Sequence, residues 1–385
     1  MRYVSRILSV FLVLIGTAIT QANVQHEATA VVRSANLGHA KVGLYALDLQ
    51  TGEVFIRLNP NDPLIPASNM KLLTSASALS ELGPDFLFKT RLRLTKPDAK
   101  SGIPSLILQG DGDPSLGDPT LLEQHKLDVD QLIQQWVTVV KKTGITDFEK
   151  LIVDDRIFDR EFVHTAWPQE QLNRWYCAQV AGINFHDNCL DVYPRPTRSG
   201  LAPILRISPE SPFLRLSNRA VSGTTDSFWI SRRLGTNEMT FRGVVKYPRS
   251  SPEHVTFHDP PNYLGQLLQH NLAKAGITVH HLYRPPMDEI LPQAKDLHIV
   301  QTAIGVVLNR CNKDSQNLFA EALFKRSGRE MTGVPGSWET GRAAMRIFLR
   351  GRLGSAAATV EIDDGSGMSR NNKVSPKAIV DLLVS

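Results

Sequence analysis

The chain has 385 residues, of which 42% are hydrophobic and 21% charged, a composition that is typical of globular proteins and excludes wholesale disorder, collagen and coiled coil. Lys and Arg number 43 and Asp and Glu number 38, so the formal net charge is only +5. Because this excess is small, we expect no nucleic-acid partner. The length is sufficient for two or three domains.

The N-terminus has the layout of a secretory signal peptide. Arg2 and Arg6 precede an apolar run over residues 7–19, and the small residues that follow predict cleavage after Ala22. The run is shorter than the ~20 residues that a spanning helix needs. We therefore expect residues 1–22 to be removed on export, a periplasmic location and no stable membrane insertion. The alternative is that the run is a membrane anchor.

The first half of the mature chain alternates strands and helices. Residues 41–57 alternate apolar and polar side chains about a Gln-Thr-Gly turn, which predicts a β-hairpin. Apolar residues from Leu72 to Leu82 have helical spacing, and Gly83 with Pro84 ends that helix. The pattern then predicts strand-like residues 89–110, a helix over 127–142 and a strand over 151–153.

The second half begins differently. Between residues 160 and 290, short strands and many prolines indicate one or more inserted β-rich modules. Helical patterns return at residues 314–326, 338–349 and 376–384.

Three cysteines remain in the mature chain. Cys177 and Cys189 lie close together in the sequence, and export would permit a disulfide between them. Cys311 would then be a free, buried thiol. We expect no zinc site, because no Cys-x-x-Cys pair is present.

A single Ser-x-x-Lys motif suggests covalent catalysis. Ser68 lies where a loop enters a predicted helix, and Lys71 follows on the same helical face. A neutral lysine amine can take the proton of a serine hydroxyl, and the free amides of a helix start favour a developing oxyanion. The alternative is that Ser68 only caps the helix and Lys71 is solvated.

Hydrolases with a Ser-x-x-Lys motif of the penicillin-recognising kind also contain Ser-x-Asn and Lys-Thr-Gly, in that order. Three Ser-x-Asn motifs are present, and they begin at Ser34, Ser315 and Ser369. The middle one opens a predicted helix after the nucleophile, so we expect Ser315 and Asn317 to face Lys71. The alternative is that Ser315 and Asn317 only cap the helix that they open.

Several segments in the same order now carry a family resemblance: PASNMKLLTSASALSELGPDF, GDPSL, VDDRIFD, DSQNLFAEAL and DGSGMSRNNKVSP. The chain resembles the D-alanyl-D-alanine carboxypeptidase/endopeptidase family of low-molecular-mass penicillin-binding proteins, in the branch with a large insertion between the first two motifs. The resemblance implies an α/β fold with a transpeptidase-like domain, in which helices flank an antiparallel sheet. We expect this domain to comprise residues 25–90 and 291–385, interrupted by inserted modules over 91–290.

The third motif does not follow the family order. Lys142-Thr143-Gly144 precedes Ser315 and ends a predicted helix, so we interpret it as a helix terminus. In the family the motif lies on a strand after the DGSG segment. The sequence stops at Ser385 inside a predicted helix, so we expect that strand to lie outside these 385 residues. We therefore expect this chain to turn over a D-Ala-D-Ala peptide slowly.

The sequence favours neither a metal nor a cofactor. Asp111, Asp113 and Asp118 are spaced like calcium ligands, but the glycine and glutamate of a calcium loop are missing. His254 and His258 lack the order of a zinc protease motif.

The resemblance implies a periplasmic serine hydrolase that acts on the D-Ala-D-Ala end, or on D-Ala cross-links, of peptidoglycan stem peptides, with β-lactam antibiotics as covalent inhibitors and no cofactor. Ser68 would attack the carbonyl, Lys71 would take its proton, and Ser315 with Asn317 would relay protons and position the substrate. Two alternatives remain open: a catalytically impaired peptidoglycan-binding relative, and a β-lactamase or esterase with the same serine and lysine.

Overall fold

The computed structural model describes residues 23–385, so the predicted signal peptide at 1–22 lies outside the described residues. A helix over 23–34 comes first, followed by the antiparallel strands β1 (Leu44–Leu47) and β2 (Val54–Leu58). These strands form the predicted hairpin. Within the described part of the chain, no helix is both long and apolar enough to cross a bilayer.

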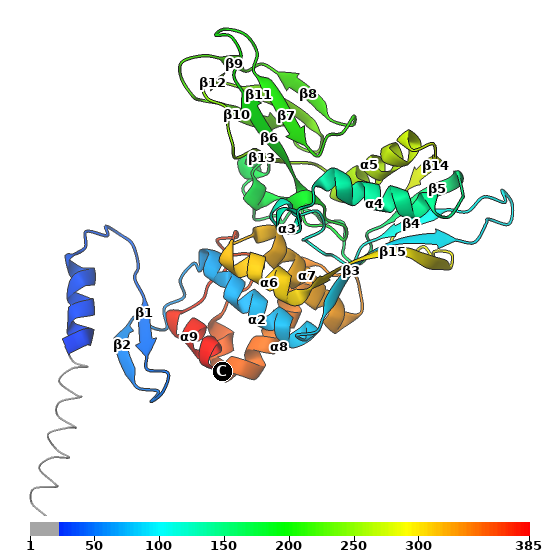
Figure 1. The fold of residues 1–385 in the computed structure, drawn as a ribbon. Helices are drawn as coiled ribbons and strands as arrows, with labels where there is room; N and C mark the ends of the chain where they lie inside the picture. Colours follow the sequence, from blue (N-terminus) through cyan, green and yellow to red (C-terminus); the bar gives the residue numbers. More distant parts are fainter. Residues whose placement is uncertain (1–22) are drawn as a thin grey trace, which may run out of the picture.

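A helical layer forms one half of the molecule and is drawn in blue, yellow and orange to red in Figure 1. Its helices share one hydrophobic core that includes Met70, Phe319 and Met345. Residues 318–328 of the central helix are buried on every side, because neighbouring helices surround it. The helices are α2 (Met70–Leu82), α6 (Ile304–Lys313), α7 (Asn317–Thr332), α8 (Trp338–Leu353) and α9 (Pro376–Val384).

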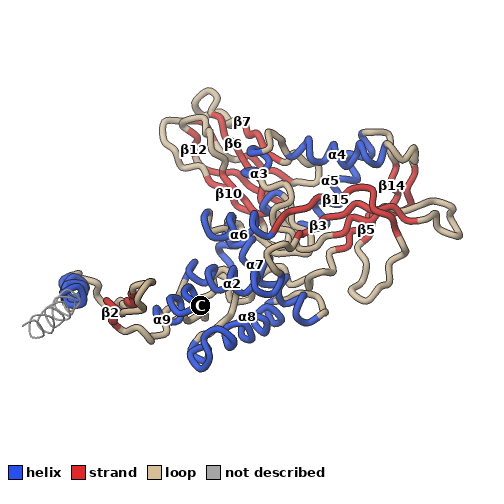
Figure 2. The backbone as a smooth tube through the Cα atoms, turned by 60° about the horizontal axis from the view of Figure 1, so that its bottom comes forward, coloured by secondary structure: helices blue, strands red, loops and turns tan. Residues whose placement is uncertain are grey.

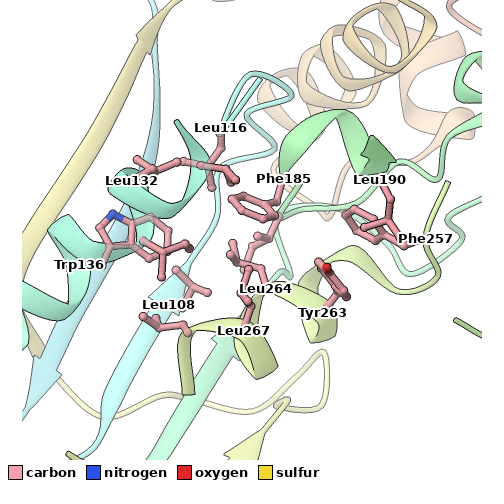
Figure 3. Close-up of a cluster of buried hydrophobic side chains, with 14 of the residues drawn as sticks. Leu108, Leu116, Leu132, Trp136, Phe185, Leu190, Phe257, Tyr263, Leu264 and Leu267 are labelled. Atoms are coloured by element: carbon pink, nitrogen blue, oxygen red, sulfur yellow. The ribbon is translucent and has the colours of Figure 1, made fainter. Parts of the chain in front are cut away.

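A five-stranded mixed sheet lies beside this layer, with strand order β14-β5-β4-β3-β15. Strand β3 is antiparallel to both of its neighbours, whereas β4, β5 and β14 run parallel. The helices α4 (Val129–Lys141) and α5 (Pro260–Lys274) contribute Trp136, Leu264 and Leu267 to the core against it (Figure 3). The strands are β3 (Leu87–Thr95), β4 (Leu106–Gln109), β5 (Asp147–Asp154), β14 (Thr278–Tyr283) and β15 (Ala294–Ala303).

The pair β3 and β15 joins the sheet to the helical layer. Strand β3 follows α2 and strand β15 leads into α6, and the two pair antiparallel along their whole length. Two of the chain crossings between the two parts therefore run through one hydrogen-bonded ladder. The expected boundaries near residues 90 and 291 fall within or beside these strands and stay a prediction.

Short strands form a separate lobe over residues 189–256, which stands at the top of Figure 1 in green. Two three-stranded sheets, β13-β6-β7 and β10-β11-β8, face a common core, and the pair β12-β9 closes one end. The tube view in Figure 2 shows the lobe apart from the helical layer. Its strands are β6 (Cys189–Arg195), β7 (Ile204–Ser208), β8 (Arg215–Asn218), β9 (Val221–Ser222), β10 (Trp229–Arg232), β11 (Glu238–Arg242), β12 (Val244–Val245) and β13 (Glu253–Thr256).

Local structure refines several sequence-based expectations. The strand-like segment 89–110 is two strands with a turn between them, and the helix expected from residue 314 begins at Asn317. Lys142-Thr143-Gly144 follows the end of α4, and Gly144 has a φ of +73°. A positive φ at this position is typical of a helix C-terminus, which agrees with the interpretation of this tripeptide.

The expected disulfide between Cys177 and Cys189 is wrong. In residues 23–385, both cysteines and Cys311 are buried free thiols. Cys177 packs in the core of the helical layer, whereas Cys189 begins strand β6 of the lobe. The two thiols therefore lie in different parts of the fold. Burial raises the pKa of the Cys177 thiol to about 12 and that of Cys311 to about 11. Such thiols contain little thiolate and are therefore poorly reactive.

Candidate active site

The predicted nucleophile lies directly before helix α2. Ser68 is the middle residue of a single 3-10 turn, Ala67–Asn69, and Lys71 is in the first turn of the helix. The Nζ atom of Lys71 lies 3.1 Å from Ser68 Oγ. Because the Lys71 residue is only 2% exposed, the alternative of a solvated surface lysine is wrong.

The predicted Ser-x-Asn residues meet this pair at the start of helix α7. Ser315 Oγ donates a hydrogen bond of 3.1 Å to Ser68 Oγ, and Asn317 Oδ1 accepts one of 2.6 Å from Lys71 Nζ. Ser315 has a φ of +55°, and a non-glycine residue in this region stores backbone strain that is often found at functional sites. All four residues that the sequence singled out therefore lie together, although 247 positions separate Ser68 from Ser315.

The amide of Asn317 has a defined orientation. Its Nδ2 donates to the carbonyl oxygen of Tyr176 at 2.7 Å. A carbonyl only accepts, so Oδ1 must be the atom that faces Lys71. Lys71 Nζ makes one further contact, at 3.1 Å, with the carbonyl oxygen of Ser366.

These contacts determine what a neutral Lys71 can do. Burial is the main cause that lowers the pKa of Lys71, and Cys311, Glu321 and Asp364 raise it in opposition. A neutral amine has two N–H donors and one lone pair. Asn317 Oδ1 and the Ser366 carbonyl are both acceptors, so they take the two N–H groups. The lone pair is left for the proton of Ser68, as a general base requires.

Sequence reasoning missed Glu321, which lies one turn after Asn317 on α7 and is fully buried. Its carboxylate accepts hydrogen bonds from the backbone N–H of Gly365 at 3.0 Å, that of Ser366 at 2.8 Å and Nε1 of Trp338 at 2.8 Å. Burial raises its pKa to about 7. The i, i+4 spacing from Asn317 was the available signal, since it places both residues on one face.

A second carboxylate folds the DGSG segment into a rigid turn. Asp364 accepts from the backbone N–H groups of Gly367 at 2.8 Å and Ser369 at 2.6 Å, and from Nδ2 of Asn372 at 2.7 Å. It also accepts from Nε1 of Trp167 at 2.9 Å. Together Glu321 and Asp364 hold the loop that presents the Ser366 carbonyl to Lys71.

Gly367 places this loop against the 3-10 turn Ala67–Asn69, which contains Ser68. Its φ is +83°, and a Cβ atom at this position would lie 1.8 Å from the carbonyl oxygen of Ala67, next to Ser68.

We expect Gly367→Ala to destabilise the protein by about 1–3 kcal/mol or more, which chemical denaturation measures. We also expect it to slow acylation of Ser68, which β-lactam labelling measures. Gly351→Ala on α8 is the control, because a Cβ there meets nothing within 4 Å and should stabilise by about 0.5–1 kcal/mol. Equal behaviour of the two variants would contradict the prediction.

Ser68 opens onto a cleft of about 830 Å³, which is within the usual range for small-molecule and peptide sites. Its lining combines the 3-10 turn that contains Ser68, the segment over residues 166–171 and the DGSG loop. The lining residues are Ile65, Ala67, Ser68, Ala166, Pro168, Glu170, Gln171, Asn317, Ser366, Gly367, Met368, Ser369, Arg370 and Asn371.

The aspartates that were considered as calcium ligands have protein partners instead. Asp111 pairs with Arg326 at 3.1 Å and Asp118 with Arg310 at 2.8 Å. Asp113 accepts from the Ser115 hydroxyl at 2.6 Å. In the part of the chain that the structure describes, no group of three His, Cys, Asp or Glu side chains could hold a metal ion.

Comparison with known proteins supports the resemblance seen in the motifs. The chain is 29% identical over 378 residues to a D-alanyl-D-alanine carboxypeptidase of Actinomadura sp. (strain R39), which covers 93% of this chain and 67% of that protein. It is 22% identical over 356 residues to the D-alanyl-D-alanine carboxypeptidase DacB of Haemophilus influenzae, covering 89% of this chain and 70% of that protein. The penicillin-sensitive carboxypeptidase A of Dictyostelium discoideum is also 22% identical, with coverage of 85% and 64%. The chain thus spans about two thirds of the length of these relatives.

The fold has solved counterparts. The crystal structure of penicillin binding protein 4 from Haemophilus influenzae matches with a TM-score of 0.72 at 21% identity, over 89% of this chain and 74% of that one. This likeness confirms the expected α/β fold with helices flanking sheets. The model of the D-Ala-D-Ala carboxypeptidase 3 (S13) family matches residues 24–385. The chain therefore belongs to the D-Ala-D-Ala carboxypeptidase 3 (S13) family.

Proposed function

We propose that this chain is a serine D-Ala-D-Ala carboxypeptidase that acts on peptidoglycan stem peptides through an acyl-Ser68 intermediate. The observation that carries the proposal is the buried Lys71 amine, which contacts Ser68 Oγ while two acceptors occupy its N–H groups. Family membership supplies the substrate class, and the cleft beside Ser68 supplies room for a peptide end.

The reaction follows from these positions. Ser68 Oγ attacks the carbonyl carbon before the terminal D-Ala, and Lys71 takes the Ser68 proton as the new C–O bond forms. The helix dipole at the start of α2 favours the negative charge that develops on the carbonyl oxygen. The C–N bond then breaks, and the proton passes from Lys71 to the leaving amine through the Ser315 hydroxyl. Water attacks the ester in the second half, and Ser68 regains its proton.

We further propose that β-lactams acylate Ser68 and that the protein works in the periplasm. A structure of the Haemophilus influenzae protein in complex with a β-lactam matches this chain with a TM-score of 0.67 at 20% identity. The periplasmic location is supported by the signal-peptide pattern of residues 1–22.

Labelling with a fluorescent penicillin followed by peptide mapping tests the proposal. The label should fall on Ser68 and disappear in Ser68→Ala, while Ser34→Ala, which alters an exposed serine of an unused Ser-x-Asn motif, should label normally. A peptide ending in D-Ala-D-Ala should release D-alanine, at the low turnover that the missing third motif predicts. Label on Ser315 or Ser366 would contradict the assignment of the nucleophile.

The alternatives predict other outcomes. Fast turnover of a chromogenic cephalosporin without D-alanine release would identify a β-lactamase or esterase. Binding to murein sacculi without any acylation would identify a peptidoglycan-binding relative.

A further inference from the structure

Positive charge is concentrated in the β-lobe. The lobe, residues 189–256, contains ten Lys or Arg and five Asp or Glu, so it carries a formal charge of +5, as much as the whole chain. The remainder of the chain therefore has no net formal charge. Because the lobe projects from the rest of the molecule (Figure 1), its charge is presented on a distinct surface.

Strand connections place five of these cations at one end of the lobe, which we call the distal end. Arg195 ends β6, Arg219 lies between β8 and β9, and Arg242 ends β11. Arg198 is in the loop that hydrogen-bonds to β9, and Lys246 directly follows β12. The strands β9 and β12 mark this end in Figure 1, on the far side of the lobe from α2 and α7.

These five side chains are exposed, and none of them forms an ion pair within residues 23–385. At the other end of the sheet β10-β11-β8, by contrast, the cations are neutralised, because Arg215 and Arg233 both pair with Glu238. Asp226, the acidic residue nearest to β9 in the sequence, pairs with Arg249 at 3.0 Å. The distal end therefore has unneutralised positive charge.

Large apolar side chains are exposed among these cations. Tyr247 is 60% exposed, Leu201 55% and Trp229 48%. Trp229 is the cross-strand partner of Arg242, with the guanidinium 5.8 Å from the ring, and Lys246 Nζ lies 4.8 Å from the ring of Tyr247. The inward-facing side chains of the same strands, Ile230 and Phe241, fill the core, so the outward rings have no place in it.

We propose that the distal end of the β-lobe docks on an anionic lipid surface. Lys and Arg are attracted to anionic headgroups, and Trp and Tyr prefer the boundary between headgroups and acyl chains. A soluble acidic polymer would be attracted by the cations but would gain little from exposed Leu and Trp side chains. Because cations and exposed apolar side chains occur together at the distal end, an anionic lipid surface fits it better than a soluble polyanion. Docking leaves the Ser68 cleft accessible, since none of its lining residues belongs to the lobe.

The test of this proposal uses the full-length exported protein, purified after expression. Its partition is measured on vesicles of phosphatidylcholine alone and of phosphatidylcholine with 30 mol per cent phosphatidylglycerol. We expect binding to the anionic vesicles only, weakening as sodium chloride is raised, because salt screens the attraction. Arg198→Glu with Lys246→Glu should lower the partition coefficient more than tenfold, since each surface cation contributes about fivefold.

Two further double variants make the outcome decisive. Arg346→Glu with Arg350→Glu on the exposed face of α8 makes the same change in net charge and should change partition less than twofold. Leu201→Ser with Tyr247→Ser should weaken binding to vesicles but not binding to heparin, a soluble polyanion.

Equal losses in the two charge-reversal variants would overturn the proposal. So would vesicle binding that is unaffected by Leu201→Ser with Tyr247→Ser, because the ligand would then be a polyanion in general. Circular dichroism spectra and unfolding temperatures check that each variant is folded. The proposal does not depend on the catalytic one, since penicillin labelling of Ser68 is measured separately.

Discussion

Replacing Lys71 with Met is expected to slow acylation of Ser68 by a β-lactam by about 10²–10⁴-fold, the range that a lost general base produces. Met has nearly the same length and suits the buried position of Lys71, which is only 2% exposed, so the variant removes the base without leaving a cavity. The hydroxyl of Ser68 keeps its hydrogen bond from Ser315 but loses the group that takes its proton.

The acylation rate should also depend on pH in a defined direction. Burial lowers the pKa of Lys71, so the neutral amine becomes more abundant as the pH rises through this lowered pKa. We expect the wild-type rate to increase with pH in that window and the rate of Lys71→Met to lack this increase.

Stopped-flow labelling with a fluorescent penicillin measures both effects. Lys142→Met is the matched control, because Lys142 is the exposed lysine of the Lys-Thr-Gly sequence that follows α4. This variant should label at the wild-type rate. A wild-type rate for Lys71→Met would contradict the role assigned to Lys71, and a slow Lys142→Met would contradict the helix-terminus interpretation.

Replacing Glu321 with Ala is expected to damage both stability and acylation. The buried carboxylate accepts hydrogen bonds from two backbone N–H groups of the DGSG loop and from Trp338. Without it these donors are buried and unpaired, which costs about 1–3 kcal/mol each. The Ser366 carbonyl would shift away from Lys71, and a misplacement of about 1 Å can cost about 10²-fold in rate.

Glu321 should also make the stability depend on pH. Its pKa is raised from 4.5 to about 7 in the folded protein, so between these values the folded state binds more protons than the unfolded state. The contribution of Glu321 to the free energy of unfolding is therefore complete below pH 4.5 and is lost as the pH rises through about 7. A shift of this size corresponds to about 3 kcal/mol.

Urea denaturation of the wild type and Glu321→Gln at several pH values isolates this contribution. Gln does not titrate, so the stability of the wild type relative to the variant should fall by about 3 kcal/mol between pH 5 and 8. Glu339→Gln, at an exposed position in the first turn of α8, serves as the control and should show the wild-type pH dependence. A constant difference between wild type and Glu321→Gln would mean that Glu321 does not titrate in this range.

Much of the candidate site could be predicted from the sequence, for two different reasons. Ser68 and Lys71 are three residues apart at the start of one helix, and the geometry of that helix alone brings them together. Ser315 and Asn317 were selected because the order of several motifs resembles a family, since no local rule connects residues 247 positions apart.

The expected disulfide shows the limit of local spacing. Cys177 and Cys189 are near in sequence, but one packs in the helical core and the other begins a strand of the lobe. Proximity along the chain does not determine which core a side chain enters, because that choice depends on the burial available across the whole fold.

The sequence by itself determined many of the local elements and the serine–lysine pair, because these depend on periodicity and on motifs within short segments. Only the tertiary structure decided that Glu321 supports the DGSG loop, that the Ser366 carbonyl directs the Lys71 lone pair toward Ser68, and that five cations meet at the distal end of the lobe. These contacts join residues that lie far apart along the chain or on different strands. They form only when strand register and helix packing fix the positions of all the participants together.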